Sequence, residues 1–270
     1  MDRYFVISNI IGFALRRTYW RHGRVRRILI GPSAGQVYRI FPAYGLAPTF
    51  GRWEPELQKL MVKLIQPGDT AYDVGANYGI HSLLMSRLAG PAGTVCAFEP
   101  HPRIYASCAE NMALNAITNI RLFNAALGEV RAELPYVEGH HDGAGHIGDD
   151  DNGSEITVSC LTIDELVSGH RIPKPDFIKI DVEGFEGRVL AGASSTVRSC
   201  HPTLAIDLHT PEQDVLVGRF MIDTGYEVYR QQGLQRITKL HRGWPDPDGI
   251  QGSVLAIHPS REQARARLFE

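Results

Sequence analysis

From about Gly68 onward, short apolar runs rich in strand-forming residues alternate with segments whose apolar residues recur at helical spacing. Strands that alternate with helices pair in parallel and are covered on both faces, so the pattern predicts an α/β domain with a doubly wound, Rossmann-like sheet. The predicted strands are 70–74, 94–98, 120–127, 176–181 and 203–209. The predicted helices begin near 80 and run through 103–115, 185–197 and 214–224, and residues 226–230 and 253–259 are predicted to form a closing antiparallel pair.

Residues 128–161 break this alternation. Their apolar ends predict two strands, and between them lies the Gly-, His- and Asp-rich stretch "EGHHDGAGHIGDDDNGS". A long polar segment of this kind inside a compact domain is typical of a cap or lid beside a site. The chain is therefore divided into an extension over 1–52, a main domain over 53–262 that carries this insertion, and a C-terminal tail over 263–270.

The charge distribution sets the first 50 residues apart from the rest. They carry eight Arg and one Asp, a net +7, whereas the whole 270-residue chain has a net charge of −2, which leaves −9 for the remainder. Two interpretations fit this basic arm: contact with something anionic, such as a membrane surface or a nucleic acid, or packing on the chain's own acidic domain. The apolar segment 4–15 within it is either an interfacial anchor or a helix docked on the core, because it falls short of the roughly 20 residues that span a bilayer.

The four cysteines are widely spaced and form no paired motif, which argues against a zinc site or a disulfide framework. Unpaired cysteines of this kind fit a reducing compartment. The apolar segment 4–15 does not resemble a secretory signal, because such a signal places positive charge before its apolar run, whereas here most of the charge follows it. We therefore predict a cytoplasmic protein, with membrane association through the arm left open.

The first predicted strand leads into the glycine-rich turn "DVGANYG", which contains Asp73, Gly75, Asn77 and Gly79. Glycine lets a ligand approach the backbone, and Asn tolerates the left-handed conformation that such turns require. A carboxylate at Asp73 would repel a pyrophosphate but accept hydrogen bonds from an ammonium group. The turn therefore favours S-adenosylmethionine, which carries an ammonium and a sulfonium, over a nicotinamide dinucleotide.

The second predicted strand ends in Glu99, which lies 24 residues after Gly75. An acidic side chain about 20 residues beyond the glycine turn can bind both hydroxyls of a ribose. The alternative for Glu99 is a charge at the start of the next helix, since Pro100 follows it.

Four stretches, "DVGANYGIHS", "AFEPHP", "NAALGE" and "DFIKIDVEGFEGRVLAGA", resemble the FkbM-type S-adenosylmethionine-dependent methyltransferases. The resemblance implies a class I methyltransferase fold, with a mixed seven-stranded sheet in the order 3-2-1-4-5-7-6, and O-methylation of sugars, polyketides or other secondary metabolites. It also implies that the turn and Glu99 hold the cofactor and that Asn124 and Ala125 lie beside its adenine. In "GRWEPE", Glu54 or Glu56 would approach the cofactor pocket.

The predicted fourth and fifth strands end in Asp181 and Asp207, and Glu183 and His209 lie two residues beyond each. Because residues two apart face the same side of a strand, these side chains are expected to converge on one pocket. An alcohol needs a base or a metal before it attacks a methyl group. We predict that His209 is this base. Asp181 or Glu183 would either orient the acceptor or serve as the base in place of His209. The alternatives are a merely hydrogen-bonded His209 and a helix-capping Asp181.

A metal is the rival arrangement. Asp181 and Asp207 could imitate the carboxylates that hold Mg²⁺ in catechol-type methyltransferases, but Gly184 stands where those enzymes carry a lysine, so Mg²⁺ is not favoured. His140, His141 or His146 of the insertion could bind a transition metal, although the irregular spacing favours a polar, mobile lid.

The leading function is O-methylation of a hydroxyl on a glycan, a lipid-linked saccharide or a secondary metabolite. The alternatives are N-methylation of RNA or protein and a non-catalytic S-adenosylmethionine-binding module. "DVEG" stands where methyltransferases of planar amino groups place an "NPPY"-like tetrapeptide, so no nucleic-acid partner is expected.

Overall fold

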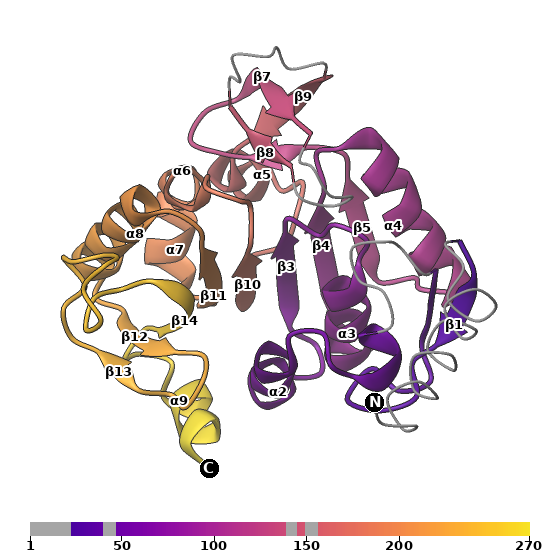
Figure 1. Ribbon diagram of the computed structural model, residues 1–270, viewed down its shortest axis with the longest axis horizontal. Coiled ribbons are helices and arrows are strands. Elements are labelled where there is room, and N and C mark those ends of the chain that lie inside the picture. The colour runs from indigo at the N-terminus through magenta and orange to yellow at the C-terminus, as the bar shows by residue number, and fades with distance from the viewer. Residues whose placement is uncertain (1–22, 40–46, 139–144, 149–155) are drawn as a thin grey trace, which may run out of the picture.

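A computed structural model of the chain describes residues 23–39, 47–138, 145–148 and 156–270. They form an eight-stranded main sheet with helices on both faces and two smaller sheets (Figure 1). In order across the main sheet, the strands are β13 (Arg236–Ile237), β12 (Glu227–Arg230), β14 (Gly252–Ile257), β11 (Thr203–Leu208), β10 (Phe177–Ile180), β3 (Thr70–Val74), β4 (Thr94–Phe98) and β5 (Ile120–Phe123).

The five strands from β11 to β5 are parallel, and β14, β12 and β13 pair antiparallel. The predicted parallel sheet and its closing antiparallel pair are therefore confirmed. When β13 is left out and the other seven strands are numbered 1 to 7 in chain order, their order across the sheet, starting from β5, is 3-2-1-4-5-7-6. The seven-strand count was wrong by one, because β13 has only two residues and is too short to show an alternating pattern.

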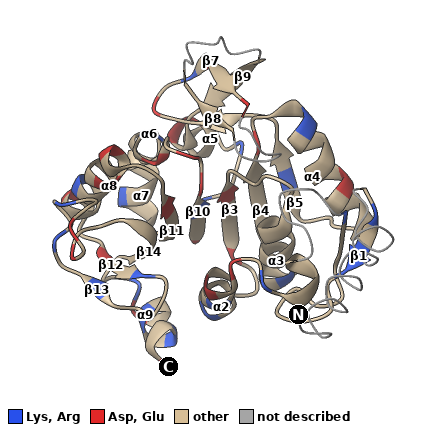
Figure 2. Ribbon diagram, in the orientation of Figure 1, with Lys and Arg blue, Asp and Glu red and all other residues tan. Residues whose placement is uncertain are grey.

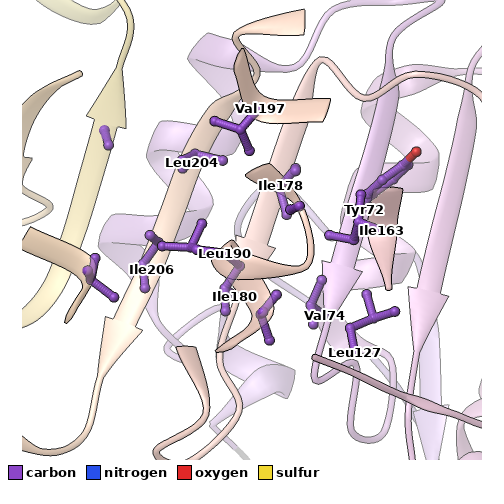
Figure 3. Close-up of a cluster of buried hydrophobic side chains, with 14 of the residues drawn as sticks. Tyr72, Val74, Leu127, Ile163, Ile178, Ile180, Leu190, Val197, Leu204 and Ile206 are labelled. Atoms are coloured by element: carbon purple, nitrogen blue, oxygen red, sulfur yellow. The ribbon is translucent and has the colours of Figure 1, made fainter. Parts of the chain in front are cut away.

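One face of the sheet packs on α5 (Ile163–Ser168), α6 (Glu186–Ala191), α7 (Ser194–Cys200) and α8 (Pro211–Thr224). Figure 3 shows the buried aliphatic side chains of this layer, with Ile178 and Ile180 between Val74 and Ile206. The other face carries α2 (Pro55–Leu64), α3 (Ile80–Ala89), α4 (Pro102–Leu114) and α9 (Glu262–Phe269). Successive residues of each buried strand point to opposite faces, so the strands are apolar on both sides.

The predicted C-terminal tail is part of this second layer. Ala264 and Leu268 lie four residues apart on α9, so they share one side of the helix, and both are buried with the apolar residues of α2. The sequence did not reveal this packing, because alanines and arginines alternate over 264–267 and show no clear apolar side of a helix.

Part of the N-terminal extension packs on the main domain. Strands β1 (Val25–Arg27) and β2 (Val37–Arg39) form a two-stranded sheet beside α4, where Asn111 and Asn115 accept hydrogen bonds from the backbone of β2. Figure 2 shows the basic residues of this hairpin, and Arg39 pairs with Glu110 of α4 at 2.9 Å. A short 3₁₀ helix, Pro48–Phe50, precedes α2. The apolar segment 4–15 lies outside the described residues, and within them no helix is long and apolar enough to cross a membrane.

The insertion and the two residues that precede it form a separate four-stranded sheet, which stands at the top of Figure 1. Its strands, in spatial order, are β6 (Ala126–Leu127), β9 (Ile156–Leu161), β7 (Ala132–Val137) and β8 (His146–Ile147). The two strands predicted at the ends of the insertion are thus confirmed as β7 and β9. His140 and His141 lie outside the described residues.

Candidate active site

A cavity of about 720 Å³ lies at the carboxyl ends of β3, β4, β10 and β11. Ligands of open α/β sheets bind at this edge, and the volume is typical of a site for a cofactor-sized molecule. The insertion covers part of it, since Tyr136 of β7 and the segment from Gly145 to Ile147 line the cavity. The insertion therefore occupies the position expected of a cap.

The glycine-rich turn forms one wall of the cavity through Gly75 and Asn77. Gly75 has φ +79°, and a Cβ there would lie 1.8 Å from the backbone oxygen of Asp181. Asn77 adopts the left-handed conformation predicted for it, with φ 50°. Gly79 is not among the residues that line the cavity; it is the N-cap of α3 and lies against the sulfur of Cys108 on α4. The turn thus lets β3 and β10 approach at the site.

Glu99 joins the ends of the first two strands of the parallel sheet. Its buried carboxylate accepts hydrogen bonds from the backbone N–H groups of Asn77 at 2.9 Å and His101 at 2.8 Å, and it lines the cavity. Burial raises the pKa of Glu99 to about 7, against the two N–H groups, which lower it. The start of α4 is capped by the His101 ring, so Glu99 is not its side-chain cap.

Of the two residues predicted beside an adenine, Ala125 lines the cavity. Asn124 is not among its described lining residues, and the Asn124 amide donates to the backbone oxygens of Glu99 and Pro100. Its role in this structure is to hold the backbone that follows β4.

Asp73 lies beneath the cavity rather than facing it. Its carboxylate is fully buried, accepts a 2.6 Å hydrogen bond from the Ser82 hydroxyl, and sits 3.6 Å from the ammonium of Lys179. Neighbouring side chains enclose the carboxylate, so the hydrogen bonds that we predict between Asp73 and a ligand ammonium, direct or through water, remain a prediction.

Lys179, on β10, is a site residue that the sequence analysis missed. Its buried ammonium donates to Asp181 Oδ2 at 3.1 Å and lies 3.5 Å from the backbone oxygen of Gly75. Burial lowers the pKa of Lys179, but the carboxylates of Asp181, Asp73 and Glu54 outweigh it and hold the pKa above its usual value. A lysine in the middle of the apolar strand "FIKI" was the available signal, because buried lysines need a partner.

The predicted catalytic residues meet at the other end of the cavity. His209 Nε2 lies 3.6 Å from Asp181 Oδ1 and 3.5 Å from Glu183 Oε2. On the far side of the ring, His209 Nδ1 donates to Glu186 Oε1 at 2.8 Å. Glu186 is fully buried and also accepts from the N–H of Gly184, so it fixes the orientation of the imidazole. Sequence reasoning missed Glu186, which begins α6.

Residues 73–228 match the methyltransferase FkbM domain family. The chain belongs to this family. Among curated proteins, it is similar to hexuronic acid methyltransferase AglP of Haloferax volcanii, 28% identical over 161 residues that span 58% of this chain and 63% of that one. It is also similar to 31-O-demethyl-FK506 methyltransferase FkbM of Streptomyces tacrolimicus, 30% identical over 47% of this chain and 60% of that one. A third relative, 2-O-methyltransferase NoeI of Sinorhizobium fredii, is 27% identical over 53% and 65%. The chain thus spans less than two thirds of the length of each.

The charges of this FkbM-family cavity suit S-adenosylmethionine. The residues that line the cavity include more acidic side chains than Lys179 and His209 can balance. The acidic ones are Glu54, Glu99, Asp181, Glu183 and Asp207. The methionine end of S-adenosylmethionine carries an ammonium and a sulfonium, both of which carboxylates stabilise. Gly75, Asn77 and Glu99 would hold this cofactor at the turn.

Glu54 is the residue of "GRWEPE" that reaches the cavity, whereas Glu56 pairs with Lys59 at the surface. Glu54 has φ 43° and lies 3.6 Å from the buried ring of His81. Burial raises the pKa of Glu54 to about 7 and lowers that of His81 to about 4, so the ring is neutral. Glu54 is therefore a carboxyl group whose charge depends on what binds beside it.

The group Asp181, Asp207 and His209 offers three ligand atoms within 4.8 Å of one another, which is compatible with a metal ion. Hydrogen bonds already hold each of the three: Lys179 donates to Asp181, Ser253 donates to Asp207 at 2.8 Å, and His209 donates to Glu186. These hydrogen bonds hold the three side chains in place and leave Nε2 of His209 facing the two carboxylates. His146 lies on the exposed rim of the cavity.

Proposed function

We propose that this chain is an S-adenosylmethionine-dependent O-methyltransferase that acts on a hydroxyl of a glycan or a secondary metabolite. The names of the relatives support this proposal: one acts on a hexuronic acid, one on 31-O-demethyl-FK506, and one is a 2-O-methyltransferase. The structural observation that carries it is the Glu186–His209 pair, which directs an imidazole nitrogen toward the two carboxylates at the cavity end.

The pair can supply the proton transfer that an alcohol acceptor requires. S-adenosylmethionine, when bound, supplies a methyl group on a positively charged sulfur. Because Glu186 accepts the Nδ1–H hydrogen bond, the lone pair of neutral His209 is on Nε2 and faces the cavity. Nε2 takes the proton of the acceptor hydroxyl as its oxygen attacks, and Asp181 and Glu183 stabilise the imidazolium that results.

The surroundings of His209 shift its pKa from the ordinary value of an imidazole. Burial lowers the pKa of His209, but the hydrogen bond to Glu186 and the charges of Glu183 and Asp181 outweigh it and raise the pKa to about 9. The ring is therefore charged at neutral pH before ligands bind, and the sulfonium of the cofactor would lower its pKa. Because the folded-state pKa is raised, the pair stabilises the fold fully below about pH 6.5, and this stabilisation is lost as the pH rises through about 9.

We expect His209→Asn to lower kcat by about 10²-fold, the usual contribution of a positioned base. Binding of S-adenosylhomocysteine, measured by calorimetry, is expected to stay unchanged. The assay follows transfer of a radiolabelled methyl group from S-adenosylmethionine to methyl glycosides of hexoses and hexuronic acids. His170→Asn is the matched control, because His170 is exposed and is not among the residues that line the cavity. A His209→Asn variant that turns over at the parental rate would refute the assigned base.

Glu186→Gln tests the partner of the base. Loss of the carboxylate removes the strongest of the contributions that raise the pKa of His209. The ascending limb of the kcat/KM pH profile, expected near pH 9 in the parent, should move to lower pH, while kcat on the plateau falls because the imidazolium loses its counter-charge. An unmoved limb would show that His209 does not titrate in this profile.

A further inference from the structure

A second hollow, a groove of about 700 Å³, lies beside the cavity. The start of α2 forms one side of it, and the segment from Arg230 to Gln235 and the start of β14 form the other. Trp244 contributes an indole that is 63% exposed. We call this the α2–β14 groove.

The groove adjoins the reaction end of the cavity. Glu54 lines both hollows. Ser253 of the groove pairs with Asp207 of the cavity in the β11–β14 register, and its hydroxyl donates to Asp207 Oδ1 at 2.8 Å. Asp207 is two residues from His209 on the same strand end. A molecule lying in the groove can therefore present one of its groups to the cavity across Glu54 and Asp207.

The lining of the groove has the chemistry of a sugar site. Gln232 and Gln235 are exposed, whereas the amides of Gln231 and Gln251 already donate to backbone oxygens. A primary amide donates and accepts hydrogen bonds, as each sugar hydroxyl does. The exposed indole of Trp244 has an electron-rich face, on which the C–H face of a pyranose ring can stack.

Charge in the groove selects a neutral sugar over an acidic one. Among the described lining residues, Arg230 is the sole cationic side chain, and its guanidinium donates to the backbone oxygens of Pro247, Gly249 and Gln251. Glu54 and Glu56 line the same groove. A sugar carboxylate would meet these two acidic residues and an arginine that already donates three hydrogen bonds to backbone oxygens, so the groove compensates a carboxylate less well for its lost hydration than it does a neutral hydroxyl.

We propose that the α2–β14 groove binds a neutral pyranose of the methyl acceptor, a proposal that rests on the O-methyltransferase function above. The ring stacks on Trp244 and bonds to the amides of Gln232 and Gln235. This places the hydroxyl to be methylated, on the same or the adjoining sugar, across Glu54 in the cavity. The groove thereby sets the acceptor class.

The test titrates two probes, methyl β-D-glucopyranoside and methyl β-D-glucuronide, into the full chain loaded with S-adenosylhomocysteine. Saturation-transfer NMR gives the Kd of each. The neutral glycoside should bind more tightly than the glucuronide, and Trp244→Ala should weaken its binding by about tenfold, as removal of an aromatic anchor commonly does. The double variant Gln232→Ala/Gln235→Ala should also weaken binding of the neutral glycoside. If Trp244→Ala does not fold, the Kd of this double variant tests the proposal.

Two matched controls exclude general surface effects. Phe269→Ala removes an aromatic side chain of similar exposure, and Gln263→Ala removes an exposed amide, both on α9 and outside the groove lining. Their Kd values should equal the parental one. Absence of binding by the neutral glycoside, tighter binding of the glucuronide, or parental affinity in both groove variants would overturn the proposal.

The two proposals fail in different ways. If S-adenosylhomocysteine does not bind or no acceptor is methylated, yet the glucoside binds in a Trp244-dependent manner, the enzymatic function is wrong and the groove is a sugar site. If methyl transfer proceeds and is indifferent to Trp244, Gln232 and Gln235, the function stands and the groove proposal is wrong.

Discussion

Gly75→Ala is expected to abolish cofactor binding and to lower the free energy of unfolding by about 3 kcal/mol, the sum of left-handed backbone strain and a core clash. The added Cβ would lie 1.8 Å from the backbone oxygen of Asp181, and neither partner is a flexible side chain. The turn must therefore separate from β10, which displaces Gly75 and Asn77 from the cavity wall. Calorimetry with S-adenosylhomocysteine and urea unfolding measure the two effects.

Gly68→Ala is the matched control for this substitution. Gly68 also has a left-handed backbone, with φ +93°, but a Cβ there would have nothing within 4 Å. The free energy of unfolding of Gly68→Ala should therefore fall only by the strain contribution, about 1 kcal/mol, and the variant should keep its cofactor affinity. Equal losses in the two variants would show that the close approach to β10 plays no part.

Lys179→Met is expected to lower the free energy of unfolding by about 3–5 kcal/mol at pH 7, the usual cost of leaving buried charges without a partner. The variant keeps the length of the side chain but leaves Asp73 and Asp181 facing each other without the ammonium between them. Cofactor affinity should fall too, because the same ammonium lies against the Gly75 oxygen of the turn. Lys59→Met is the control: its exposed pair with Glu56 contributes about 0–1 kcal/mol.

The deficit of Lys179→Met should shrink in acid. Burial raises the pKa of Asp181, but Lys179 and His209 outweigh it and hold the pKa below its usual value. A carboxylate with a depressed folded-state pKa contributes stability above its unfolded pKa of about 4 and loses it as the pH falls through the folded value. Urea unfolding at pH 7 and in acid gives the two deficits, and a deficit that grows in acid would contradict the ion-pair assignment.

The sequence predicted the strands and helices well because their patterns are local. The run "TAYDV" and the helical spacing after Gly79 each reveal their element from a few neighbouring residues. The strand order also followed once the family resemblance was recognised, apart from the two-residue β13. These features need no knowledge of which distant residues meet.

The side chains that organise the site could not be predicted in the same way. Lys179 matters because it reaches Asp73, which lies on a neighbouring strand 106 residues earlier in the chain. Glu186 matters because a strand from elsewhere brings His209 to it. In both cases the partner is supplied by tertiary structure, and a charged residue viewed alone is typical of a solvated surface.

Glu54 stands in the wall shared by the cavity and the α2–β14 groove. Two molecules that contact one ionisable group cannot bind independently, because each changes the protonation that the other encounters, and this coupling is reciprocal. With a pKa of about 7, Glu54 would release a proton when the sulfonium donor arrives and recover it once that positive charge has left with the methyl group. Turnover would then carry a proton cycle in the wall between the two substrates, separate from the one at the histidine.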